Sequence, residues 1–330
     1  MAAIALVGAA VWSAIDERSK RRTEYQTAYS WLRLLLRFTL ALTLLEYGFV
    51  KVFPEQFSSP TLYELTGTYG DSTPMHLLWT FIGASTAYTI FSGSMEVIAG
   101  MLLLFRRTST VGAMMAAGVL LNVVLLNFCY DVPVKLYSTH LCLMALFLLL
   151  PDVSALWRFL ILRRPAELTG VWVPRAERRT LRITAHVLQA LVVIAALYAA
   201  AWSAYRALEK PAPKVALYGV WAVDSSEGTF PKGRWNKMIL ETKFAVIFHT
   251  DGDRVVLRSP ECNDGAQTIA FPKKDKGAML HWAKDAPGMV TLTGTWDGVA
   301  AKVVMHKTSP DTFTLQTRGF HWVQEYGVNR

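Results

Sequence analysis

Two long apolar runs separated by a short polar segment constrain this chain most. Residues 111–126 are interrupted only by Asn122, and residues 141–150 contain no charge. Between the two runs lie the polar segment 127–135 (NFCYDVPVK) and His140. Ionisable groups at membrane depth are costly, so they usually face a bundle interior or a wet cavity, where they serve function or form a structural pair. The pattern predicts a membrane hairpin with a polar turn.

Apolar segments recur through the first 208 residues of the chain. A span needs about 20 apolar residues, because each helical residue rises about 1.5 Å through a hydrocarbon core about 30 Å thick. Five segments are about that long: residues 31–53, 77–105, 110–129, 134–162 and 183–207. The apolar segment 2–15 is too short. It lies in the interface, belongs to a partial span or is a signal-like remnant, although the Lys and Arg residues that follow it are atypical of a cleaved signal peptide.

Basic residues indicate how the spans are oriented. They gather near the start of the first span, where Arg33 and Arg37 lie, after the second span, and between the fourth and fifth spans. Because Lys and Arg favour the cytoplasmic side, these regions are expected inside. The loop 54–75 has no Lys or Arg, so this loop, the turn at Asp131 and the C-terminal domain are expected outside. The net charge of +9 then reflects topology and attraction to anionic lipids, and no nucleic-acid partner is expected.

Polar residues in and near the spans are the candidates for a functional site. Those expected to converge on the outer leaflet are Glu46, Lys51, Asn122, Asn127, Asp131, Lys135 and His140. In the functional interpretation, Glu46, Asp131 and His140 are catalytic groups that handle protons. Lys51 and Lys135 bind an anionic group, and Asn122 and Asn127 orient it. Glu96 is a further ligand-binding candidate, but it lies about two thirds of the way along the second span, nearer the cytoplasmic side.

The same residues have a structural interpretation. Glu46 and Asp131 would neutralise Lys51 and Lys135, and the asparagines would form hydrogen bonds between helices, each contributing about 0.6 kcal/mol. His140 would be a satisfied buried histidine, and Glu96 a buried neutral acid bonded to a neighbouring span. The three cysteines form no Cys-x-x-Cys motif, and no phosphate-binding loop or haem-attachment motif is present. No metal site is therefore expected, and the cofactor stays unknown.

From residue 217 onward the chain is typical of a small all-β domain. Short strand-like segments alternate with turn signals such as Asp251-Gly252-Asp253 and Asp297-Gly298. Seven or more such strands predict an antiparallel sandwich or small barrel. The domain's tryptophans are expected to anchor its core: Trp221, Trp235, Trp282, Trp296 and Trp322. The linker is too short for free movement, so the domain should lie near the outer ends of the spans, capping a pocket or recruiting a partner.

Several motifs resemble the DoxX family of bacterial membrane proteins. They are YGFVKVFPEQF at 47–57, FSGSMEVIAG at 91–100, LFRRT at 104–108 and the polar segment 127–135. The similarity covers about residues 31–151 and implies a four-helix membrane core. Relatives have been linked to membrane oxidoreductase assemblies that handle thiosulfate, thiols or radicals and to quinone reduction, and more distant ones resemble assembly factors or cargo receptors. The Gly and Glu of the family's second span correspond to Gly93 and Glu96.

The predicted fold class is a membrane all-α protein with a four-helix transmembrane core, a fifth span and a partial N-terminal span, followed by a small all-β soluble domain. The predicted regions are an apolar and basic N-terminal stretch (1–27), the DoxX-like bundle (28–164), a basic cytoplasmic loop (165–182), the fifth span (183–208), a linker (209–216) and the extracytoplasmic β sandwich or barrel (217–330). The expected location is the bacterial cytoplasmic (inner) membrane, crossed several times.

Two functions stay open, and with them whether the protein is an enzyme. The first is an accessory protein of the bacterial envelope, a subunit of a redox or thiol-stress system whose outward-facing polar pocket binds a quinone, a lipid head group or a small sulfur species. The alternative is a non-catalytic assembly or binding protein that holds an extracytoplasmic protein partner through its β domain. A small-solute transporter is disfavoured, because the sequence shows no inverted repeat and no pair of broken spans.

Overall fold

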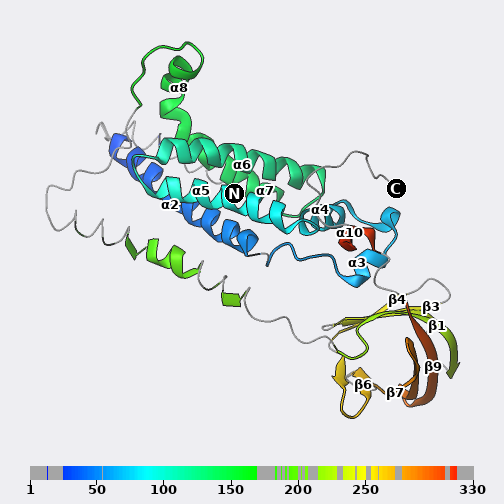
Figure 1. Cartoon of the computed structure of the whole chain (residues 1–330). Coiled ribbons are helices and arrows are strands. Elements are labelled where there is room, and N and C mark those ends of the chain that lie inside the picture. Colours follow the sequence, from blue (N-terminus) through cyan, green and yellow to red (C-terminus); the bar gives the residue numbers. More distant parts are fainter. Residues whose placement is uncertain are drawn as a thin grey trace. The chain divides into compact units, whose positions relative to one another are not determined.

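The chain folds into two compact units, seen in a computed structural model (Figure 1). The helical unit contains Met1–Gln56 and Ala87–Arg206, and the β unit contains Phe57–Thr86 and Ala207–Arg330. The structure describes residues 25–53, 55–168, 215–228, 233–241, 244–249, 254–258, 260–271, 277–308 and 313–317, with residue 13 and isolated positions and short runs between 183 and 206. Most of the predicted segment 2–15, most of the loop 165–182, the linker up to residue 214 and Trp322 lie outside the described residues.

The described part of the helical unit is built from long helices. They are α2 (Tyr25–Val52), α5 (Thr86–Leu104), α6 (Ser109–Cys129), α7 (Lys135–Leu149), the 3-10 turn η2 (Leu150–Asp152) and α8 (Val153–Leu160). Among the described residues, three helices are long and apolar enough to cross a membrane: Thr86–Leu104, Ser109–Cys129 and Lys135–Leu160. α2 is 28 residues long but carries four ionisable side chains and is not among the three. The membrane character that the sequence predicted is thus supported for these three helices.

One buried apolar cluster joins the helices of this unit. It contains Leu40 and Leu44 of α2, Leu103 of α5, Ala116 of α6 and Ala145 of α7, each at most 2% exposed. The helical residues 193–199, within the predicted fifth span, add the buried Ala196 to the same cluster. Small residues at several of these positions let the helix backbones approach closely, which is how helices associate where lipid supplies no hydrophobic drive.

The second predicted span is not a continuous helix. The segment contains α4 (Pro74–Gly83), which begins at a proline and is capped by the Thr73 hydroxyl, and then α5, which starts only at Thr86. Gly83 ends α4 in close contact with the loop, since a Cβ there would lie 2.2 Å from Ser58 O. The prediction of one span over 77–105 is therefore wrong, because the chain breaks at residues 84–85 and α4 belongs to the β unit.

All described strands of the β unit form a single antiparallel sheet that is curled into a half-barrel (Figure 1). Its strands are β1 (Gly219–Gly228), β2 (Trp235–Leu240), β3 (Phe244–His249), β4 (Arg254–Arg258), β5 (Glu261–Asn263), β6 (Thr268–Phe271), β7 (Ala278–Ala286), β8 (Met289–Trp296) and β9 (Val299–Thr308). The strand order is β4-β3-β2-β1-β9-β8-β7-β6-β5. β1 pairs with both β2 and β9, so the first and last strands lie side by side and β4 and β5 form the edges. Of the two predicted alternatives, the sandwich is wrong, because one sheet holds every described strand.

The two faces of the half-barrel are covered to different extents. The inner face carries the main core, which includes Trp221, Trp235 and Trp282, with Trp296 packed against it, as predicted for these tryptophans. β7 alternates buried and exposed residues along its first half, which indicates one covered face. Three consecutive residues are buried instead in each of β1, β2 and β3. The outer face of these three strands must therefore be covered as well.

Candidate functional site

Lys51 and Glu96 form a buried ion pair between α2 and α5. Lys51 Nζ lies 2.5 Å from Glu96 Oε1, and the two residues are 7% and 2% exposed. From the sequence, Glu96 was expected away from the outer group, and Lys51 was expected to be neutralised by Glu46 in the structural interpretation. That arrangement is wrong, because α5 begins nine residues later than the predicted span (86 − 77) and Glu96 consequently lies in the middle of the helix.

Two glycines bring these charges together. A Cβ on Gly48 would lie 2.9 Å from Gly93 O, and a Cβ on Gly93 would lie 2.6 Å from Gly48 O, so the two backbones touch here. Lys51 follows Gly48 by three residues, and Glu96 follows Gly93 by three. Residues three apart share a helix face, so the contact that joins the glycines also joins the charges. The repeated spacing of a glycine and a charge in both helices is the sequence signal that would have predicted this pair.

The polar turn between α6 and α7 is closed by its own residues. Lys135 Nζ donates to Asp131 Oδ1, and this bond holds the pKa of the exposed Asp131 below its ordinary value. Asn127, which is 6% exposed, donates through Nδ2 to Ser138 Oγ at 2.9 Å. Asp131 adopts a positive φ of 53°, which an aspartate tolerates in a turn. These contacts agree with the structural interpretation of Asn127, Asp131 and Lys135.

The remaining predicted site residues lie apart. Glu46, Asn122 and His140 are exposed on α2, α6 and α7, respectively. His140 Nδ1 lies 2.6 Å from Leu136 O, one turn earlier in its own helix. Within the described residues, no hydrogen bond or ion pair joins any of these three side chains to another predicted site residue, and no group of three or more His, Cys, Asp or Glu side chains could hold a metal ion. Four of the predicted residues therefore form two separate ion pairs, Lys51–Glu96 and Asp131–Lys135, and the predicted set does not form one bonded network.

A second candidate site lies inside the β unit, where the loop after α2 covers the outer face of the half-barrel. This loop clamp consists of Leu62, Tyr63 and Glu64 on the loop, Glu241 in the turn between β2 and β3, and Phe248 on β3. Leu62 is 6% exposed and shares a cluster with Val220, Ile239 and Val246 on β1, β2 and β3. Tyr63 stacks on Phe248 with ring centroids 6.4 Å apart. The apolar outer face of the three strands is thus buried by a segment more than 150 residues earlier in the chain.

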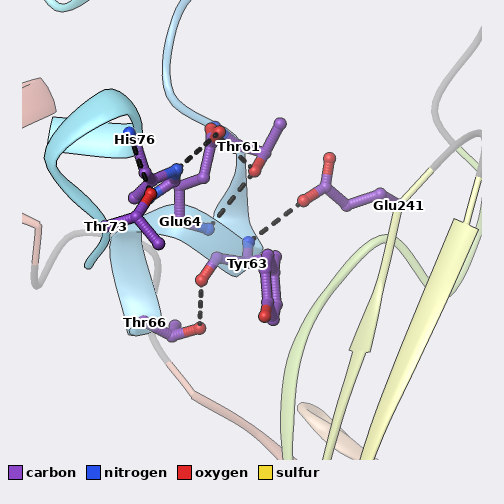
Figure 2. Close-up of polar contacts among 7 residues, drawn as sticks. All are labelled: Thr61, Tyr63, Glu64, Thr66, Thr73, His76 and Glu241. Atoms are coloured by element: carbon purple, nitrogen blue, oxygen red, sulfur yellow. Dashed lines mark hydrogen bonds and ion pairs between the residues drawn. The ribbon is translucent and has the colours of Figure 1, made fainter. Parts of the chain in front are cut away.

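Helix α3 (Leu62–Thr66) is held by hydrogen bonds at its N-terminus (Figure 2). Thr61 and Glu64 form a capping box, in which Glu64 N donates to Thr61 Oγ1 at 3.3 Å and Thr61 N donates to Glu64 Oε2 at 2.6 Å. Glu241, in the turn after β2, adds a third acceptor, because Tyr63 N donates to Glu241 Oε1 at 3.1 Å. The first N–H groups of a helix have no acceptor within the helix and favour a nearby negative charge. A helix of only five residues therefore receives part of its cap from the β domain.

The groups of the loop clamp affect the pKa of the Glu241 carboxyl group. This residue is 9% exposed, and burial raises the pKa of its carboxyl group. The backbone N–H groups of Tyr63 and Leu62 oppose that change in pKa, while the nearby Glu64 adds to it. Glu64 in turn lies 3.9 Å from His76 Nδ1 on α4. The loop is braced further by the ring contact of Phe57 with Trp79, whose centroids are 5.2 Å apart.

Sequence reasoning overlooked the loop clamp, although two signals pointed to it. Thr61-x-x-Glu64 is a capping-box pattern and predicts a helix start within the outer loop. Residues 238–240 (MIL) and 245–247 (AVI) are continuously apolar, whereas a sheet with one solvated face alternates. Together they indicate a helix and an apolar outer face that needs a cover.

Comparisons with known proteins give one relative. No known family profile matches the chain, and no solved structure matches it. The chain is 38% identical over 116 residues to the uncharacterized protein YwoB of Bacillus subtilis (strain 168). The matched region is 35% of this chain and 73% of YwoB.

Proposed function

The chain belongs to the family of YwoB, and we propose that it is an integral membrane accessory protein of the bacterial envelope that holds its β domain outside the cytoplasm to bind an extracytoplasmic protein partner. The observation that carries this proposal is the loop clamp. Residues 57–86 and the half-barrel fold as one unit, so the β domain is attached through two distant parts of the chain. Such double attachment suits a module that is presented in a fixed way rather than one that moves on a tether.

The order of helices along the chain supports the proposed topology. Residues 57–86 precede three apolar helices, at 86–104, 109–129 and 135–160. If each crosses the membrane, three crossings would leave the chain on the side opposite to the loop. The β domain folds with that loop, so one more crossing is required after residue 160. The apolar segment 183–207 has the length for it, and the absence of Lys and Arg from loop 54–75 supports a shared side outside the cytoplasm.

A second candidate function is the redox or thiol-stress role that the DoxX resemblance implies. The specific observation in its favour is the Lys51–Glu96 pair. Glu96 Oε2 is buried and has no hydrogen-bond partner among the described residues, and an ionisable group within a span marks a proton or ligand pathway by default. In that role the pair would exchange a proton with a bound quinone or a small sulfur species.

Affinity purification of three forms of the protein distinguishes the two functions. The forms are the wild type, a chain that lacks residues 215–330, and the double variant Lys51→Met/Glu96→Gln. The proposal predicts an extracytoplasmic protein that co-purifies with the wild type and the double variant but not with the truncated chain. The truncated chain is also compared with the point variant Leu62→Ala, which loosens the clamp but keeps the whole β domain. If no protein depends on the β domain, while a quinone or sulfur compound is lost from the double variant alone, the binding role is wrong and the redox role stands.

A further inference from the structure

Two arginines of α2 are buried in the helical unit and form no ion pair with the other residues that the structure describes. Arg33 is 8% exposed and Arg37 is 6% exposed. Arg33 Nη2 donates to Leu148 O at 3.1 Å. Arg33 Nε and the Nε and Nη1 atoms of Arg37 are buried and have no hydrogen-bond acceptor in the part of the chain that the structure describes. The ion pairs found among those residues include neither arginine.

The two side chains line a small hollow, here called the arginine hollow. Its other lining residues are Leu103, Ser109, Thr110 and Leu148. The enclosed space is about 10 Å³, roughly the room that one water molecule needs, and it opens toward the surface. The Arg37 guanidinium lies 4.8 Å from the Phe38 ring centroid, which helps to fix its orientation.

The charge around the hollow is positive despite one nearby carboxylate. Asp152 is 2% exposed and accepts a hydrogen bond from Thr110 Oγ1 at 2.7 Å, but it makes no ion pair with either arginine. Removing a cation from water without a partner costs several kcal/mol. Three donor nitrogens without acceptors among the described residues, on two guanidinium groups one helical turn apart, therefore call for an acceptor that carries negative charge.

We propose that Arg33 and Arg37 bind a phosphate-type oxyanion at the mouth of the arginine hollow. One oxygen of the anion enters the enclosed space in place of water, and the others stay at the opening, because the hollow is too small for the whole group. The planar guanidinium fork matches the spacing of phosphate oxygens. In the proposed topology the start of α2 lies at the cytoplasmic face, where basic pockets between helices bind anionic head groups. The anion is a phospholipid head group or a soluble phosphate, and both present the same oxygens.

Native mass spectrometry of the full chain in detergent distinguishes the two sources. The probes are phosphatidylglycerol, phosphatidylcholine as the neutral reference, and inorganic phosphate. The variants are Arg37→Gln and Arg37→Lys, and the matched control is Arg158→Gln, which removes the same charge from an exposed position on α8. Arg37→Lys keeps the charge but lacks the planar fork, so it also serves if Arg37→Gln fails to fold.

A lipid site predicts that the wild type and Arg158→Gln retain phosphatidylglycerol over phosphatidylcholine, while both Arg37 variants bind it at least about tenfold more weakly. A soluble-anion site predicts the same pattern across the variants for inorganic phosphate and no preference between the lipids. Either pattern supports the proposal and names its source. Equal binding of both probes by the wild type and a folded Arg37 variant would overturn it, as would a loss of the same size in Arg158→Gln.

Discussion

Shortening Leu62 to alanine should loosen the loop clamp. The side chain is 6% exposed in the cluster with Val220, Ile239 and Val246, so the change removes three buried carbons. At about 0.8 kcal/mol for each, the contact loses about 2.4 kcal/mol, before any cost of the cavity that remains. If the clamp opens independently of the rest of the sheet, its opening equilibrium rises about 60-fold, because about 1.36 kcal/mol corresponds to a factor of ten.

Hydrogen exchange measured by mass spectrometry on the full chain in nanodiscs tests this value. Amides of residues 62–66 should exchange about 60-fold faster in Leu62→Ala than in the wild type, provided that closing is fast relative to exchange. Met279→Ala is the matched control, because Met279 is 58% exposed on β7 and its truncation should leave the loop unchanged. If the loop amides exchange at the same rate in both variants, the account of the clamp as a packed contact is wrong.

Three further predictions concern the clamp and the pair in the helices. Burial raises the pKa of Glu241, so the folded β unit binds a proton more tightly than the unfolded chain, and its stability should increase as the pH falls from 7 toward the ordinary pKa of a glutamate. Thermal melts of Glu241→Gln should lack this increase. Parallel pH profiles for the two proteins would contradict the assignment. Lys51→Met should destabilise the helical unit by about 3–5 kcal/mol, because it leaves Glu96 buried and unpaired, and adding Glu96→Gln should restore most of the loss. Equal unfolding of the single and double variants in a denaturing-detergent titration would refute the coupling. Gly93→Ala should lower the free energy of unfolding by about 1–3 kcal/mol in the same titration, because its Cβ would lie 2.6 Å from a backbone oxygen. The control Gly118→Ala, where no atom lies within 4 Å of the added Cβ, should be neutral. Similar losses of stability for both variants would argue against the close helix contact.

Local patterns predicted the elements of this fold better than their partners. The apolar segments predicted at 110–129 and 134–162 correspond to the helices Ser109–Cys129 and Lys135–Leu160, and the turn between them contains the expected polar residues. The break at residues 84–85 was missed because apolar composition continues through it, from α4 into α5. Mean hydropathy does not distinguish an apolar helix that belongs to the β unit, such as α4, from one that belongs to the helical unit.

The candidate sites show the same difference between sequence neighbours and spatial neighbours. Asp131 and Lys135 are four residues apart, and their pairing was among the expectations. Lys51 and Glu96 are 45 residues apart, and Tyr63 and Glu241 are 178 apart, so their pairing depends on which helix or strand packs on which. The close approach of the glycines and the continuous burial along the strands indicate which elements pack together. Both features can be interpreted once the packing partners are known.

Labelling of single cysteines with a membrane-impermeant thiol reagent tests the central claim, that the loop and the half-barrel lie together outside the cytoplasm. In a chain whose three native cysteines are replaced by serine, the reagent is applied to intact spheroplasts that carry Tyr69→Cys, Met279→Cys or Arg107→Cys, all at exposed positions. The account predicts labelling of positions 69 and 279 in intact spheroplasts and of position 107 only after permeabilisation. Labelling of 69 and 279 from opposite sides of the membrane, or of 107 and 279 from the same side, would contradict it.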